Sequence, residues 1–321
     1  MMELDQKIIQ QKYGKRFSHL SRKRSIANCF SIIFLHVGSA IIFTSSALYL
    51  WQFDKFYGAI ASVFAFLFVG TRFRALANIL HECTHNGFAP YYRLNSIFSH
   101  IICVVLFYSL DSYKKHHRTH HAFTGDYEKD LEFGPIQHFL LHKDFNRTRL
   151  FEHIHRLVTL QYIGHYIGGV ALDLKEEKFW LILRSLYILT IVFSSIYFGL
   201  GSYQSIGLML FLIAPVFTIV PTITYIMDII DHGGLLGNEN MAERARNYTT
   251  KSTLLNFLIF PHHDSYHLVH HMFPSMPTRD LHTCHEILLE EEPSYSALTH
   301  TLKGLIQVST RLQSSTATDT A

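Results

Sequence analysis

Long apolar runs alternate with polar blocks along this chain. A helix needs about 20 apolar residues to cross the hydrocarbon core of a bilayer. Runs of about that length or longer occupy residues 26–50, 57–77, 179–200 and 203–227. Arg72, Arg74 and Arg184 lie inside the second and third runs, where we expect their side chains to extend to the membrane interface. The pattern predicts an all-α membrane protein with about four transmembrane helices.

A fifth apolar run, residues 94–110, is shorter and contains His100. If this run does not cross, the tight hairpins at residues 50–57 and 200–203 place all the other polar blocks on one side of the membrane. Those blocks are residues 78–93, 111–178 and 228–321. Every histidine cluster falls in them, so we interpret residues 94–110 as a segment that enters and leaves on the same side.

Basic residues ahead of the first run orient the chain. They are Lys12, Lys15, Arg16, Arg22, Lys23 and Arg24. Positively charged flanks stay in the cytoplasm, so we expect a cytoplasmic helical cap that carries the histidines. The predicted organisation is a basic cytoplasmic segment at residues 1–25, a single membrane domain at 26–308, and a disordered tail of small polar residues at 309–321.

The composition indicates where the chemistry lies. The 321 residues include 23 His, and 48% are apolar. The formal net charge is only +3, without the one-sided basic stripe of a nucleic-acid surface, so no nucleic-acid partner is expected. The cysteines show no CxxC spacing, which argues against a disulfide framework or a thiolate zinc site. They are Cys29, Cys83, Cys103 and Cys284.

Three histidine clusters share a helical spacing. "HECTH" at 81–85 places two imidazoles four residues apart, whereas "HRTHH" at 117–121 and "HLVHH" at 267–271 each place three at i, i+3 and i+4. Such positions share a helix face. Eight converging nitrogens exceed what one tetrahedral zinc requires and suit two metal ions. The candidate ligands are His81, His85, His117, His120, His121, His267, His270 and His271.

An ordinary structural role is the alternative for these histidines. A single HxxxH is weak evidence, and an isolated histidine near a membrane surface, such as His138, is usually solvated or hydrogen-bonded. The duplicated HxxHH is much rarer, which favours a metal site. A membrane transporter of metal or haem is the alternative from a different class, but it predicts histidines at mid-depth in the spans, and only His36 and His100 lie inside apolar runs.

The ordered boxes, and "HLVHHMFPSMP" at 267–277, resemble the integral-membrane fatty acid desaturases and hydroxylases, whose signature is HxxxH, HxxHH and HxxHH between pairs of spans. The resemblance covers roughly residues 30–290 and implies two non-haem Fe ions held by the eight histidines. It also implies a ninth ligand just after the last span, which is His232 in "MDIIDHGG". Asp231 could orient an imidazole there, and Asp228 is a candidate near one iron.

Further residues could support the ligands. His116 and His263 lie four positions ahead of box histidines and could act as neighbouring donors, while Arg246 could pair with an acid or a substrate headgroup. An ordinary surface role is the alternative for each. Ring N–H groups need acceptors, and the acids near the boxes are Glu82, Asp126, Asp130 and Glu132.

The resemblance implies oxygen-dependent desaturation of a fatty acyl chain, carried by a lipid or a thioester. Hydroxylases and carotenoid ketolases use the same scaffold and remain alternatives. Removing hydrogen from an unactivated methylene needs O₂ and two electrons, and the chain has neither GxGxxG nor the HPGG of fused cytochrome b5 domains. We therefore expect a separate donor, ferredoxin, rubredoxin or cytochrome b5, and favour a bacterial inner membrane over the endoplasmic reticulum.

Overall fold

The computed structural model describes residues 4–21, 24–143, 145–168, 177–200, 202–249, 252–259, 261–263 and 265–298. The predicted tail at 309–321 lies outside these residues. The described part is helical and contains no strand, and four of its helices are long and apolar enough to cross a membrane. The predicted fold class, an all-α membrane protein with about four spans, is confirmed.

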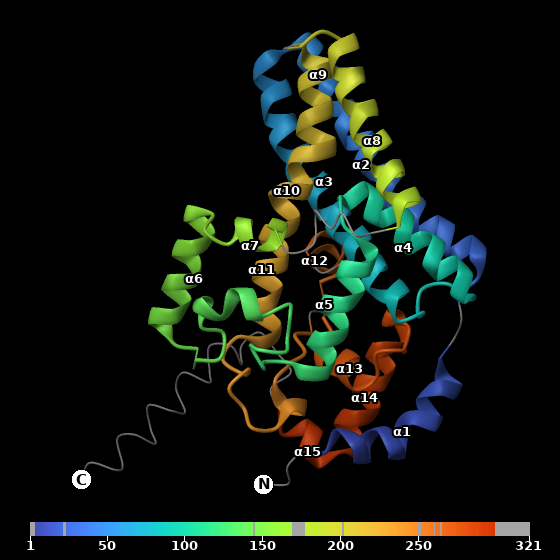
Figure 1. The fold of residues 1–321 in the computed structure, drawn as a ribbon, viewed down its shortest axis with the longest axis vertical. Coiled ribbons are helices and arrows are strands. Elements are labelled where there is room, and N and C mark those ends of the chain that lie inside the picture. Colours follow the sequence, from blue (N-terminus) through green and yellow to red (C-terminus); the bar gives the residue numbers. More distant parts are fainter. Residues whose placement is uncertain are drawn as a thin grey trace.

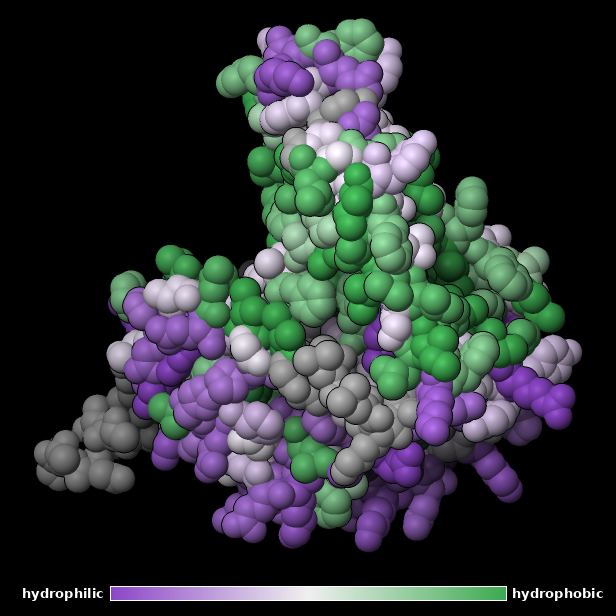
Figure 2. Space-filling view, turned by 45° about the horizontal axis from the view of Figure 1, so that its top comes forward, coloured by the Kyte–Doolittle hydropathy of each residue, from purple (hydrophilic) through white to green (hydrophobic). Residues whose placement is uncertain are grey.

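The four spans form an upright bundle (Figure 1). They are α2 (Ile26–Phe53), α3 (Lys55–Thr84), α8 (Lys178–Tyr197) and a composite span of α9 (Tyr203–Leu208), the π-helical turn η2 (Met209–Ile213), α10 (Ala214–Phe217) and α11 (Ile219–His232). Their side chains leave large apolar groups exposed, such as Phe34 at 77% and Phe64 at 66%. Figure 2 shows this hydrophobic band between two polar ends. A band of this kind needs lipid to cover it.

The composite span is irregular for identifiable reasons. Pro215 and Pro221 lie in α10 and α11, and proline removes a helical hydrogen bond and clashes with the preceding turn. A π-helical turn precedes Pro215, and Thr218 departs from helical geometry with φ −127°. The Thr218 hydroxyl donates to the Ala214 carbonyl at 2.7 Å. These breaks let α11 approach α3 and end at His232 beside the other histidines.

The fifth apolar run, residues 94–110, lies mostly in α4 (Tyr92–Leu106). The chain then bends by 105° into α5 (Leu110–Phe123). Phe107, between them, has a left-handed backbone with φ 59°. The 15 residues of α4 rise only about 22 Å, less than the roughly 30 Å core of a bilayer. The chain leaves the histidines at the end of α3 and returns to them along α5, as the predicted same-side segment would.

The expectation that the arginines extend to the interface is wrong for Arg72 and Arg184, which are 1% and 5% exposed. Arg72 donates to the Phe257 carbonyl, with its guanidinium carbon 3.9 Å from the centre of the Phe257 ring. Arg184 donates to the Tyr108 carbonyl, at the junction of α4 and α5. Protein carbonyls therefore take the place of water for these two charges, as buried cations require.

A second, wider part of the fold surrounds the histidine-bearing ends of the spans (Figure 1), and Figure 2 shows that its surface is mostly polar. Its other elements are α1 (Gln6–Leu20), η1 (Gly134–Phe139), α6 (Arg147–Thr159), α7 (Ile163–Gly168), η3 (Met241–Glu243), α12 (Thr253–Leu258), η4 (Pro261–His263), α13 (His267–Met272), η5 (Thr278–Asp280), α14 (Leu281–Glu291) and α15 (Pro293–Ser296). The helix α1 packs on α13, α14 and α15, so the basic N-terminal segment is part of the folded unit.

Candidate metal centre

Four helices bring the predicted histidines together. The last turn of α3 carries His81, and His85 caps its end. The helix α5 carries the second box, α11 ends at His232, and the short α13 carries the third box. All nine predicted histidines fall into two groups, and within each group one ligand atom per ring lies within 4.8 Å of all the others.

The first group contains five rings, which are those of His81, His85, His117, His121 and His270. Their Nε2 atoms lie close together. The Nε2 of His117 is 2.7 Å from that of His85 and 3.0 Å from that of His121. The Nε2 of His121 is in turn 3.1 Å from that of His270. We refer to these five rings as group one.

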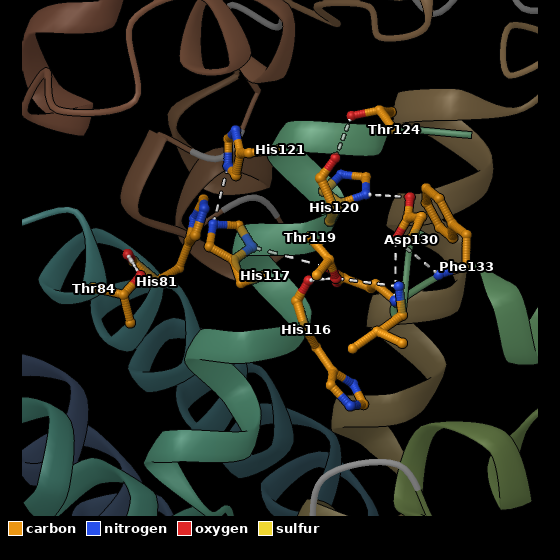
Figure 3. A network of polar contacts seen from close by, with 12 residues as sticks. His81, Thr84, His116, His117, Thr119, His120, His121, Thr124, Asp130 and Phe133 are labelled. Carbon is orange, nitrogen blue, oxygen red and sulfur yellow. Dashed lines mark hydrogen bonds and ion pairs between the residues drawn. The ribbon is translucent and has the colours of Figure 1, made fainter. Parts of the chain in front are cut away.

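The second group contains the rings of His120, His232, His267 and His271. The Nε2 of His267 is 2.8 Å from that of His232 and 3.0 Å from that of His271. Figure 3 shows how His120 departs from its neighbours on α5, with its ring turned toward Asp130 and away from His117 and His121. We refer to these four rings as group two.

The two HxxHH boxes are divided between the groups in opposite ways. On α5 the i and i+4 rings join group one and the i+3 ring joins group two, whereas on α13 the i and i+4 rings join group two and the i+3 ring joins group one. Successive helical residues are about 100° apart, so i+4 lies about 40° from i, and i+3 lies about 60° from i on the other side. One box can therefore serve two ions.

The donor set fits two transition-metal ions. A carbonyl only accepts, so the bond of 2.7 Å from His232 Nδ1 to the Arg244 carbonyl places that ring's proton on Nδ1 and leaves a bare lone pair on Nε2. That lone pair faces the Nε2 of His267, which also faces His271. A cation among such buried nitrogens would relieve their repulsion. Nitrogens about 2.1 Å from one ion and at right angles lie about 3 Å apart.

Burial keeps the rings of α13 in the form that a metal needs. The pKa values of His267, His270 and His271 lie well below the ordinary imidazole value, first because burial disfavours the charged ring and second because neighbouring imidazoles repel it. The three rings are therefore neutral near pH 7. A neutral imidazole offers one nitrogen lone pair to an ion.

Acceptors outside the groups orient several rings. Asp130, fully buried, accepts from His120 Nδ1 at 3.1 Å. Glu132 and Asp231 lie farther away, at 3.8 Å from His117 Nδ1 and 3.7 Å from His267 Nδ1. A carboxylate or carbonyl behind a ligating imidazole fixes its tautomer and its direction. Both groups thus have a support layer, and the closest contacts belong to group two.

Comparison with known proteins fits this geometry. A family model described as fatty acid desaturase matches residues 58–303. This chain belongs to the fatty acid desaturase family. The match lies inside the predicted domain at 26–308, whose own boundaries stay a prediction.

Three curated relatives illustrate the family. The sn-1 acyl-lipid omega-3 desaturase (ferredoxin) of Synechocystis sp. is 24% identical over 79% of this chain and 72% of its own length. The chloroplastic omega-3 fatty acid desaturase of Brassica napus is 25% identical over 65% of this chain and 56% of its own length. The acyl-lipid omega-3 desaturase (cytochrome b5) of the Arabidopsis thaliana endoplasmic reticulum is 30% identical over 29% of this chain and 24% of its own length.

The structure contradicts two of the acceptors that were expected from the sequence. Asp126 does not face a histidine of either group: it accepts from the Glu128 and Lys129 amides and pairs with the Lys129 side chain at 3.1 Å. Glu82 is buried, but it accepts from Arg24, from His262 and from the Thr278 amide. Glu82 therefore ties the end of α3 to the surrounding chain.

The other candidate neighbours have varied surroundings. Arg246 is buried at 4% exposure and donates to the Gly233 carbonyl, so it is not a surface arginine. His116 lies outside both groups and points away from them (Figure 3). The side chain of His263 lies outside the described residues. Asp231 contacts His267, although the sequence favoured the adjacent His232.

Two adjoining cavities lie beside the groups. A cavity of about 60 Å³ has Asp228 and rings of both groups in its wall. A cavity of about 130 Å³ adjoins it, with a wall of tyrosines, apolar residues and a few polar side chains. The two share Arg74, Ala77, Tyr113, Glu132 and Thr224.

Sequence reasoning missed two functional neighbours. Tyr166, on α7, donates to Asp228 across 62 positions of the chain. The Arg244 carbonyl supports His232, and any residue could supply a carbonyl there. Neither position carries a motif, so the sequence offered no signal for them.

Proposed function

We propose that this chain inserts a double bond into a fatty acyl chain, using O₂, at two non-haem Fe ions held by the two histidine groups. The observation that carries the proposal is the pair of nitrogen-only groups, which draw on all three boxes and His232. Membership of the fatty acid desaturase family supports the reaction class.

Each set of residues has a role in this proposal. Group one and group two would each hold one iron, and Asp130, Asp231 and Glu132 would orient rings from behind. When bound, the irons supply the activation of O₂ that removal of hydrogen from a methylene requires. Asp228, in the cavity wall between the groups, accepts the Tyr166 hydroxyl and is held in place by it.

The cavities support a route for the acyl chain. The wall of the outer cavity is mostly apolar, and the cavity adjoins the inner one. Its polar groups are those of Arg74, His116, Glu132, His165 and Thr224 and the hydroxyls of its tyrosines. An acyl lipid or thioester would place its chain there, so that the wall fixes which carbon lies beside the metal groups. Tyr113, common to both cavities, lies where the chain would pass.

A separate protein would deliver the electrons. Two of the relatives are named for ferredoxin and for cytochrome b5, and rubredoxin is a third possibility of the same kind. The exposed cations Lys115 and Arg118 lie on α5, beside the second box, and could attract an acidic carrier. We place this face in the cytoplasm because the basic N-terminal segment lies on it. A bacterial inner membrane, in preference to the endoplasmic reticulum, is part of the same proposal.

Hydroxylases and carotenoid ketolases would use the same metal groups, and the products separate these activities. A transporter of metal or haem is disfavoured because the nine rings gather at one end of the bundle, where they form two closed groups.

The test is lipid analysis of cells that express the wild type or the His120→Ala variant, each with a supplied electron donor. New unsaturated acyl chains in the wild type alone, located by mass spectrometry, are the expected result. Hydroxylated or ketolated products would instead establish an alternative activity of the scaffold. Unchanged lipids in a protein that contains two irons would contradict the acyl substrate.

A further inference from the structure

The N-terminal helix α1 lies outside the family-matched residues, yet it is fastened to the third histidine box. One face of α1 is buried together with Leu4, two residues ahead of the helix: Leu4, Ile9, Tyr13 and Phe17 are each at most 2% exposed. They pack in one cluster with side chains of α13 and α14, and the Phe17 ring meets Phe273 edge-on at 4.8 Å. Burial of this extent shows that α1 is docked as a structural part.

The helix α13 needs support from outside. It has only six residues, and a helix this short is unstable alone. Its last carbonyls also lack partners within the helix. Two of them are bonded by α1: the Gln6 side-chain amide donates to the His271 carbonyl at 3.1 Å, and that of Gln10 donates to the Met272 carbonyl at 2.6 Å.

A second connection leads from the start of α1 to His232. The Asn240 side chain donates to the Leu4 carbonyl at 2.6 Å, and the Leu4 amide donates to Glu243 at 3.4 Å. Arg244, the next residue, supplies the carbonyl that holds the proton of His232. The helix is therefore linked to the backbone at His271 and to the support of His232, and both rings belong to group two.

We propose that α1 is a clasp that fixes the ligand positions of group two, with Gln6 and Gln10 as its positioning residues. The inference rests on the proposed function only where it says that group two holds an iron. Its mechanical part, that α1 restrains α13, depends on the contacts alone. Group one takes only His270 from α13 and its other four rings from α3, its cap and α5, which the clasp does not touch, so its ion would depend much less on Gln6 and Gln10.

The experiment compares the wild type with the Gln6→Ala, Gln10→Ala double variant in the purified full chain. Alanine preserves the helix, and Gln11→Ala, at an exposed position of the same helix, is the matched control. Hydrogen exchange of residues 265–276, followed by mass spectrometry, reports on α13 directly. Transfer of iron to a chelator reports on the ions. Both readouts are independent of catalysis.

We expect exchange in residues 265–276 to accelerate about 10-fold in the double variant, since two hydrogen bonds of modest net strength are lost. One of the two irons should leave about 10-fold faster, and Gln11→Ala should match the wild type. In a His267→Ala background, which keeps only the iron of group one, the double variant should still accelerate exchange in residues 265–276 but should barely change the release of the remaining iron. Replacing both glutamines with Glu, which keeps their size and removes the N–H donor, should reproduce the loss.

Each remaining outcome decides a separate point. Unchanged exchange in residues 265–276 overturns the clasp, whatever the iron does. Equal acceleration of both irons overturns the assignment to group two. A wild type that binds no iron overturns the proposed function, and in that case the exchange arm still decides whether α1 restrains α13.

Discussion

The two histidine groups are built by different means. Group one takes four of its rings from the end of α3 and from α5, whose lengths are 30 and 14 residues. Group two takes one ring from α5, one from the last residue of α11 and two from the six-residue α13. Regular helices position the first group, whereas the second depends on outside acceptors such as Asp130 and the Arg244 carbonyl. The difference predicts which contacts matter for each ion.

The largest effect should come from deleting one ring in each group. His270→Ala and His267→Ala should each abolish detectable product, because both ions are needed, and each should lower the iron content from two per chain toward one. Metal analysis and product analysis of the same samples check this. His138→Ala, at an exposed ring outside the groups, should retain both. An active His270→Ala protein with two irons per chain would contradict the ligand assignment.

Removing Arg24 should destabilise the end of α3, which carries two rings of group one. This buried cation pairs with Glu82, the residue after His81, and reaches Thr278 at 3.3 Å. Arg24→Ala leaves a buried carboxylate with one cationic partner fewer, at a cost of about 3–5 kcal/mol. Thermal unfolding in detergent measures it. Arg16→Ala, which breaks the exposed pair with Glu291, should leave the unfolding temperature unchanged; equal effects would contradict the argument.

Weakening an acceptor behind a ring of group two should lower the affinity for one ion without removing any ligand. Asp130→Asn keeps the size of the side chain but weakens the acceptor behind His120. We expect about a 10- to 100-fold loss of affinity for one iron, with the other unaffected, measured by metal titration. Asp126→Asn is the matched control, because Asp126 contacts only its own turn and Lys129. An equal loss at both ions would show that the groups are not separable.

The smallest effect should come from Tyr166→Phe, which removes the donor to Asp228. We expect product formation to fall about 5-fold, as for one hydrogen bond, with both irons retained. Burial raises the pKa of Tyr166 well above its ordinary value, and the charge of Asp228 raises it further. The hydroxyl therefore stays protonated from pH 6 to 9 and remains a donor to Asp228 throughout that range. Wild-type product formation in the variant, or the loss of an iron from it, would contradict this role.

The sequence predicted the spans and the histidines that meet, because both follow from local periodicity. The division of the rings between the two groups could not be predicted from that periodicity. Spacing places His117, His120 and His121 on one face, yet the structure sends the middle one to a different group. That outcome depends on how α5 faces α11 and α13, which is a tertiary property.

Partners of buried charges were also beyond the sequence. Asp126 and Asp130 looked equivalent in "GDYEKD", and only the turn at Gly125, with φ 82°, brings Asp130 back to His120. Arg72 looked like an interfacial residue until the Phe257 carbonyl, 185 positions away, was seen beside it. Contacts over such separations leave no periodic pattern.

The helices α5 and α13 each supply rings to both groups, so the order in which the chain is synthesised sets when each group can form. By the time residue 121 has been made, four rings of group one exist, but only one ring of group two does. Neither group is complete until α13 emerges, nearly 150 positions after α5. The helix α1, made first, meets the partners described above only after residue 240 has been made. On the proposed function, both ions would therefore be loaded after most of the chain has been inserted, and the contacts of α1, the oldest segment, would form last.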